Sequence, residues 1–362
     1  MYFAIAFVIY TLANLYVFYR SWNILPASFL IKGVYSICFF FSYSSFIVAM
    51  LLRETLSPEL LKPLYLLGTM WLGITLYCTI YLLITDCFYF LFRSKLFRRI
   101  QMVVGYILVG AILSVGYYQF SNPQRVEKTI VVHKNGGKYD HLKVVAFGDL
   151  HLGMTIDKKK LQKYVKLINA EKPDIILFSG DMVDNCTYLL EKEKMYEEIN
   201  QLQAPLGVYS CLGNHEYLSG IEKSREFFRK TNLKILVDSV VQVDESFWII
   251  GRDDKRMNPS RESLEALVQQ TDPSQPLILL DHQPYLLEEA EKNGIDLQLS
   301  GHTHHGQIWP GNWIVQRIFE VAHGYKQKGN THIYVTSGLG LWGPPLRLGT
   351  QSEWVVFNIE FK

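Results

Sequence analysis

The sequence predicts a helical membrane domain followed by a domain of class α/β. The first third of the 362-residue chain is apolar and holds none of the ten histidines. The rest alternates short apolar runs rich in branched residues with helical segments, which is the pattern of α/β proteins. Several of these runs end in glycine followed by Asp, Asn or His. We therefore expect a multi-pass transmembrane helical anchor over residues 1–120, a linker over 121–141 and the α/β domain over 142–362.

The composition excludes several other classes of protein. The chain is 49% hydrophobic, 14% aromatic and 19% charged, against about 25% charged in an ordinary soluble domain. Disordered chains, collagens and disulfide-rich mini-proteins do not have this composition. Residues 1–120 hold eight Lys or Arg against three Asp or Glu, and residues 121–362 hold 28 against 31. Because the second part has no basic field, we expect no nucleic-acid partner, and the sequence implies no protein partner.

Four apolar stretches predict the membrane anchor. Each has close to the ~20 residues that cross a hydrocarbon core of about 30 Å, and they run over Tyr2–Tyr19, Phe29–Leu52, Pro63–Thr85 and Met102–Phe120. Buried helices of a soluble domain would normally show a polar face, and a cleaved signal peptide could explain the first stretch alone. We expect a multi-pass membrane protein whose partner is the lipid bilayer.

The charges between the stretches predict the orientation. The third connection holds four basic residues, Arg93, Lys95, Arg98 and Arg99, which places it on the cytoplasmic side. Arg20 and Lys32 of the first connection fall on the same side. Four spans then put both termini and the α/β domain on the outer, extracytoplasmic face, although the segment after the fourth span is also basic.

The elements of the second part follow in order. Residues 121–142 read as a linker plus a strand, because Asn122-Pro123 ends the fourth helix and Asn135-Gly136-Gly137 is a turn signal. Lys143 to Phe147 reads as the next strand. Asp157 is placed to cap a helix that Pro173 stops. Seven further strands are expected, at Ile175–Ser179, Val208–Leu212, Trp248–Gly251, Leu277–Leu280, Leu297–Ser300, Ile333–Thr336 and Trp354–Phe361.

Polar residues follow five of the predicted strands. They stand in Gly148-Asp149-Leu150-His151, Gly180-Asp181-Met182-Val183-Asp184, Gly213-Asn214-His215-Glu216, Asp281-His282 and Gly301-His302-Thr303-His304. Each motif alone is common in turns. In an open α/β sheet, however, ligands bind beyond the carboxyl ends of the strands. Carboxylate, imidazole and amide without thiolate suit Mn, Fe or Zn, and there are enough ligands for two ions. Two ions ~3.5–4 Å apart form a clamp for displacement at phosphorus.

In this order the blocks GDLH, GDMVD, GNHE, a lone histidine after a strand, and GHTH resemble the calcineurin-like metallophosphoesterases over about residues 142–358. With the anchor, the chain resembles the membrane-anchored branch of that family, which includes transmembrane proteins with a metallophosphoesterase domain and related bacterial enzymes. The resemblance implies a four-layer α/β/β/α sandwich with two divalent metal ions at one edge.

The resemblance also implies a role for each matched residue. Asp149, His151 and His304 would hold the first metal, and Asn214, His282 and His302 the second. Asp181 would bridge them, with a hydroxide between the metals as nucleophile. His215 would stand beside the leaving oxygen as an acid or electrostatic stabiliser.

Three neighbouring residues are interpreted separately, and two of them have two interpretations each. Asp184 could orient a metal ligand or cap a helix. Arg347 could contact a substrate phosphate or form a structural ion pair. Glu216 stands where many relatives carry Asp, a change that we take as tolerated. The remaining histidines, His133, His141, His305, His323 and His332, are expected at the surface or in a polar core.

The sequence thus predicts a membrane-anchored dimetal phosphoesterase that hydrolyses a phosphate ester or a diphosphate bond. A lipid or lipid-linked substrate is favoured because an anchor concentrates the enzyme at the bilayer. One alternative is a pyrophosphatase of the UDP-2,3-diacylglucosamine type from lipid A synthesis, which would need a cytosolic site. Another is a non-enzymatic receptor or scaffold, which would be expected to have lost a metal ligand. The loops Arg252–Ser260 and Ile308–Tyr325 would decide between substrates.

Overall fold

The computed structural model describes residues 2–88 and 94–362. Arg93, part of the basic cluster that predicts the orientation, lies outside these residues. The chain divides into two compact units. We call Met1–Tyr118 with Gly343–Leu346 the helical unit, and Gln119–Trp342 with Arg347–Lys362 the sheet unit.

Four long helices form the helical unit, as predicted. They are α1 (Tyr2–Trp22), α2 (Phe29–Leu51), α3 (Pro58–Cys87) and α4 (Lys95–Ser121), and all four are long and apolar enough to cross a membrane. α3 begins five residues before the predicted Pro63, because Pro58 occupies its first turn, where the missing N–H costs nothing. α4 begins before the predicted Met102, because the helix continues through the basic residues that precede the apolar run.

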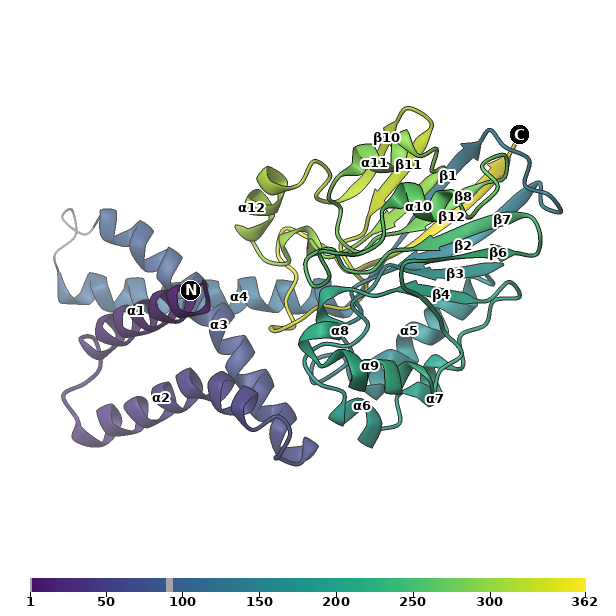
Figure 1. Cartoon of the computed structure of the whole chain (residues 1–362). Helices are drawn as coiled ribbons and strands as arrows, with labels where there is room; N and C mark the ends of the chain where they lie inside the picture. The colour runs from purple at the N-terminus through teal and green to yellow at the C-terminus, as the bar shows by residue number, and fades with distance from the viewer. Residues whose placement is uncertain (1, 89–93) are drawn as a thin grey trace. The chain divides into compact units, whose positions relative to one another are not determined.

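Two six-stranded mixed sheets form the sheet unit (Figure 1). The first sheet has the order β1 (Gln124–Val132), β12 (Glu353–Phe361), β2 (His141–Phe147), β3 (Ile175–Phe178), β4 (Val208–Cys211) and β5 (Lys234–Leu236). The second has the order β10 (Gly324–Lys328), β11 (Thr331–Val335), β9 (Leu297–Ser300), β8 (Leu277–Leu280), β7 (Phe247–Gly251) and β6 (Ser239–Val243). The strands β2 to β5 are parallel, and so are β7, β8, β9 and β11.

Alternating side chains divide the core into layers. Val144 and Ala146 of β2 pack between the two sheets, whereas Val145 and Phe147 pack on the outer face against α5 (Lys158–Ala170). On the far face of the second sheet, Leu279 packs with α10 (Leu264–Val268) and α11 (Leu287–Lys292). The order helix, sheet, sheet, helix confirms the expected α/β/β/α sandwich.

Short helices complete the sheet unit. They are α6 (Tyr188–Lys192), α7 (Tyr196–Ile199), α8 (Asn214–Leu218), α9 (Ile221–Phe228), α12 (Gly311–Ile318) and the 3-10 turn η2 (His304–Gly306). The predicted cap of α5 is present, since the Asp157 carboxylate accepts from the Lys160 backbone N–H at 3.1 Å.

The segment over 121–141, predicted as a linker plus a strand, contains the strand β1. α4 runs to Ser121, and β1 begins at Gln124 and pairs in parallel with β12 over its whole length. The boundary between the units falls earlier, between Tyr118 and Gln119. β1 is an edge strand with charged side chains such as Arg125 and Lys128, so its sequence does not read as a buried strand.

Candidate metal centre

The carboxyl ends of the parallel strands deliver all seven predicted metal ligands. Asp149 and His151 follow β2, Asp181 follows β3, Asn214 follows β4 as the first residue of α8, His282 follows β8, and His302 and His304 follow β9. Both sheets contribute, so the ligands gather from segments up to 155 residues apart in the chain. They form two groups around Asp181.

The first group consists of Asp149, His151 and His304. The Nε2 atoms of His151 and His304 lie 3.0 Å apart, and Asp149 Oδ1 lies 3.5 Å from His304 Nε2. All three side chains are buried. Two imidazole nitrogens that face each other can share one proton at most, whereas a cation between them satisfies both. These are the three residues predicted for the first metal.

The second group consists of Asp181, His282 and His302, with Asn214 beside them. His282 Nε2 lies 3.1 Å from Asp181 Oδ2. Asn214 Oδ1 lies 2.8 Å from His302 Nδ1 and 3.3 Å from His282 Nε2. Asp181 Oδ2 also lies 3.7 Å from His151 Nε2, so this carboxylate stands between the groups, where the bridging ligand was expected.

Backbone groups orient the ligands. His282 Nδ1 lies 2.7 Å from the Ser179 carbonyl oxygen, which fixes the ring so that Nε2 faces Asp181. The His302 N–H donates to the Asp149 carboxylate at 2.9 Å. The His215 N–H donates to Asp181 Oδ1 at 2.8 Å. Such partners set the direction of a ligand before a metal arrives.

The backbone at the site is strained. Five of the seven ligands have left-handed φ angles: Asp149 at 51°, His151 at 49°, Asp181 at 57°, His302 at 71° and His304 at 48°. Residues other than glycine seldom adopt this conformation, and it persists where the surrounding structure enforces it, often at functional sites.

Two of the glycines that precede the ligands are required because a carboxylate of the centre lies where a side chain would begin. A Cβ atom on Gly301 would lie 2.3 Å from Asp149 Oδ2, and one on Gly213 would lie 2.2 Å from Asp181 Oδ1. A side chain at either position would displace a carboxylate of the centre, which explains why glycine precedes the polar residues at these strand ends.

His215 lies at the edge of the centre and is held by Asp184. Its Nδ1 atom is 2.8 Å from the Asp184 carbonyl oxygen and 3.4 Å from Asp184 Oδ1. Burial lowers the pKa of His215, but the carboxylates of Asp181 and Asp184 outweigh it and raise that pKa to about 10. The side chain is 13% exposed, so a cationic imidazole is accessible from solvent.

Asp184 does not cap a helix, because Thr187 precedes α6. Its Oδ1 atom instead lies 3.6 Å from His151 Nδ1 as well as near His215. Burial raises the pKa of Asp184, but these two histidines hold it below its ordinary value. This placement favours the interpretation of Asp184 as an orienting carboxylate over that of a helix cap.

The electrostatics fit divalent cations. Burial raises the pKa of Asp149, because an ionised carboxylate is costly there without a cation. Burial also lowers the pKa of His302 to about 3 and that of His304 well below its usual range. Both rings are therefore neutral, which is the form that binds metals. With this donor set of carboxylate, imidazole and amide, the two groups could hold two ions.

Glu216 plays a part that the sequence analysis missed. Its buried carboxylate accepts from the backbone N–H groups of Gly213 and Met182, both at 2.7 Å, and of Val183 at 3.0 Å. It thus ties the loop after β4 to the loop after β3. Its place three residues after Gly213, at the start of α8, is a sequence signal for such a cap.

Arg347 is not placed to bind a substrate. Its side chain is fully buried, and its guanidinium donates to the carbonyl oxygens of His304, Ser337 and Gly340 at 2.9, 2.7 and 2.7 Å. It cannot reach a substrate in this conformation, and its hydrogen-bond partners are carbonyls rather than the predicted carboxylate. We correct this prediction: Arg347 positions the backbone of His304.

The other polar residues lie outside the two groups. Asp281, next to His282, is held by Arg261 through two contacts of 2.9 Å. His305 stacks on His323, whose Nε2 lies 3.1 Å from Glu353. His332 is buried, and His133 and His141 are exposed, as expected for histidines without a ligand role.

Comparison with known proteins agrees with this geometry. A family model described as calcineurin-like phosphoesterase matches residues 142–306. The chain is 35% identical over 249 residues to an uncharacterized metallophosphoesterase of Aquifex aeolicus, covering 66% of this chain and 92% of that protein. It is 29% identical over 382 residues to an uncharacterized metallophosphoesterase of Campylobacter jejuni, covering 99% and 98%. It is 31% identical over 267 residues to a transmembrane protein with metallophosphoesterase domain of Bos taurus, covering 68% and 60%.

Proposed function

The chain belongs to the calcineurin-like metallophosphoesterase family and is a phosphoester hydrolase, and from this premise we propose that it cleaves a phosphate ester or diphosphate bond of a lipid or lipid-linked substrate. The observation that carries the proposal is the pair of ligand groups on either side of Asp181, with the accessible His215 beside them.

The roles of the residues follow from their positions. When bound, two divalent ions would offset charge on the phosphoryl oxygens and lower the pKa of water to near 7. Burial lowers the pKa of His215, but the carboxylates of Asp181 and Asp184 raise it overall, so this imidazole can serve as the donor of a proton to the departing oxygen. Asp184 keeps the His215 ring in place. Substrate would enter beside Asn214, His215 and His302, which are partly exposed, whereas the first group is buried.

Two loops supply candidates for substrate binding. With Arg347 buried, the exposed Arg256 is the guanidinium that we assign to a substrate phosphate. Its charge adds to burial and to His282 in lowering the pKa of His302, so it acts close to the second group. Arg256 lies in the loop Arg252–Ser260, one of the two segments expected to select the substrate.

The second loop supports a lipid substrate. Along α12, Trp313, Ile314 and Ile318 are 57%, 59% and 59% exposed. The next residue, Phe319, has its ring 6.1 Å from that of His302. Apolar side chains open to solvent beside a metal centre suit acyl chains or the surface of a bilayer. The four candidate membrane spans hold the chain at such a surface.

The experiment is a substrate panel on the full-length protein in vesicles. Manganese is the first ion to add, with iron and zinc as the other expected metals. We expect hydrolysis of an aryl phosphodiester that chelation abolishes, and faster hydrolysis of a phospholipid or lipid diphosphate. In the double variant Trp313→Ser/Ile314→Ser, the ratio of lipid to aryl ester turnover should fall about tenfold, because two exposed apolar side chains are lost. An unchanged ratio would remove the argument for a lipid.

No feature of the described residues favours the alternative of a UDP-2,3-diacylglucosamine-type pyrophosphatase over other lipid-linked phosphates. That substrate enters the panel as one member. A receptor or scaffold without activity was expected to lack a ligand, and all seven ligand positions are present with His215.

A further inference from the structure

The helical unit contains a cavity of about 590 Å³ at the ends of three of its helices. Tyr19 and Arg20 come from the end of α1, Asp86 from the end of α3, and Arg98 and Arg99 from the start of α4. The volume lies within the range of about 300–1,000 Å³ typical of small-molecule sites. None of these residues belongs to the metal centre.

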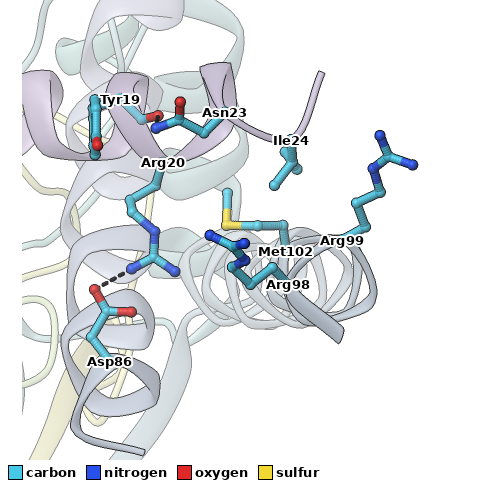
Figure 2. Close-up of a pocket in the computed structure, with 8 residues that line it drawn as sticks. All are labelled: Tyr19, Arg20, Asn23, Ile24, Asp86, Arg98, Arg99 and Met102. Carbon is cyan, nitrogen blue, oxygen red and sulfur yellow. Dashed lines mark hydrogen bonds and ion pairs between the residues drawn. The ribbon is translucent and has the colours of Figure 1, made fainter. Parts of the chain in front are cut away.

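The lining of the cavity is strongly cationic. Among the described residues, its lining includes three guanidiniums and one carboxylate, which together carry a formal charge of +2. The carboxylate of Asp86 already pairs with Arg20 and accepts from the Tyr16 hydroxyl. Figure 2 shows the Arg98 side chain extending from α4 toward the Arg20–Asp86 pair, and Arg99 extending from the same helix in another direction. The site therefore has positive charge in excess of what its own carboxylate neutralises.

If the four helices cross a membrane, the cavity lies at the depth of the lipid headgroups. It is at the ends of apolar helices that are long enough to cross a membrane, where Trp, Tyr, Lys and Arg are typical. Lys32 Nζ lies 4.7 Å from the Trp22 ring centre near the same end. Basic pockets between membrane helices on the cytoplasmic side bind anionic headgroups, and guanidinium matches the geometry of phosphate.

We propose that this cavity binds the phosphate group of an anionic phospholipid. Arg98 contacts the phosphate, Arg99 adds positive charge to the lining, and Asp86 holds Arg20 at the wall of the cavity. The bound lipid links the ends of α1, α3 and α4, so it stabilises the helical unit. This site is separate from the proposed catalysis, and each can fail without the other.

The test measures lipid retention by the full-length protein. The protein is reconstituted in phosphatidylcholine vesicles with or without phosphatidylglycerol and then extracted in a neutral detergent. Native mass spectrometry measures how much lipid stays bound. The variant Arg98→Gln/Arg99→Gln is compared with Arg53→Gln/Lys62→Gln, which also removes two positive charges but outside the cavity. We expect the first variant to lose about tenfold in phosphatidylglycerol affinity and the control to keep it.

Phosphatidylglycerol should also raise the melting temperature of the wild-type protein and not that of Arg98→Gln/Arg99→Gln. His215→Ala should retain the lipid like the wild type, which separates this site from the metal centre. Equal retention by the two charge variants would overturn the proposal. A third arm adds inorganic phosphate in phosphatidylcholine alone. If inorganic phosphate raises the melting temperature of the protein as much as phosphatidylglycerol does, the assignment to a lipid is overturned.

Discussion

Among single residues, His215 has a pKa that is set by the carboxylates around it. The carboxylates of Asp181 and Asp184 keep its ring charged, and 13% of its side chain is exposed. We predict that His215→Ala lowers kcat by about 10²–10⁴-fold, because the leaving oxygen loses its proton donor, while the metal content stays at the wild-type level. The control is His332→Ala, which removes a buried histidine that contacts Val131 and Tyr325 instead. Full turnover in His215→Ala would show that another group is the acid.

A substitution at Gly301 tests how tightly the metal centre is packed, because it adds a single Cβ atom beside Asp149. A methyl group there would meet Asp149 Oδ2 at 2.3 Å, so Gly301→Ala should displace the carboxylate and release metal from the first group. Elemental analysis of the purified variant should find fewer ions than in the wild type. Gly110→Ala is the control, since a Cβ at that helical position meets nothing within 4 Å. Normal metal content in Gly301→Ala would mean that Asp149 is not a ligand.

Glu353 shows how one buried carboxylate joins elements. From β12 it accepts from the Thr336 hydroxyl and the Ser337 N–H, both at 3.1 Å, and lies 3.1 Å from His323 Nε2. Burial raises the pKa of Glu353, but the hydrogen bond and charge of His323 and the other donors lower it overall. A carboxyl whose pKa is lower in the folded state contributes stability above its unfolded pKa of about 4.3, and that stability is lost as the pH falls below it.

We therefore predict that Glu353→Gln destabilises the protein by about 1.5–3 kcal/mol at neutral pH, the value of hydrogen bonds to a charged group. The difference from the wild type should shrink as the pH is lowered through about 4. Melting in detergent over a pH series measures it. Glu360→Gln on the same strand is the control, because Glu360 is 35% exposed and its carboxylate lies 3.6 Å from Lys362 Nζ. A constant difference at all pH values would contradict the role of the charge.

The elements that bury apolar residues on both faces are those that the sequence predicts. β3 and β8 are continuous runs of Ile, Leu and Phe, and the four long helices are apolar and long enough to cross a membrane. The edge strands β6 and β10 are not among the predicted strands. β10 spans Gly324–Lys328 with no apolar alternation, and it exists because its backbone pairs with β11. Local sequence does not contain that pairing.

The same division holds at the metal centre. Asp149, Asp181 and His302 follow recognisable strands, so their convergence can be predicted from the rule that parallel strands end at one edge. The parts played by Glu216 and Arg347 cannot be predicted in this way. Glu216 and Arg347 each bind backbone groups of loops that meet only after the two sheets have packed. The neighbouring sequence does not identify those partners.

For the whole molecule, the distribution of charge predicts an orientation. Arg20, Arg98 and Arg99 gather at one end of the helical unit, as expected if the first and third connections lie on the same side. If that side is cytoplasmic, the sheet unit is outside. We predict that protease added to spheroplasts degrades the sheet unit, while a cytoplasmic marker stays intact. Protection of the sheet unit until the cells are lysed would reverse the orientation and admit substrates made in the cytosol.

The central claim is that loops from two sheets hold a pair of divalent ions that act on a phosphoryl group. The most direct measurement is the metal content of the full-length protein together with its hydrolysis of an aryl phosphodiester, for the wild type and for Asp181→Asn. We predict about two ions per wild-type chain, and loss of both metal and hydrolysis in the variant, because Asp181 stands between the two ligand groups. Full hydrolysis by the metal-free wild-type protein, or unchanged metal content in Asp181→Asn, would contradict the claim.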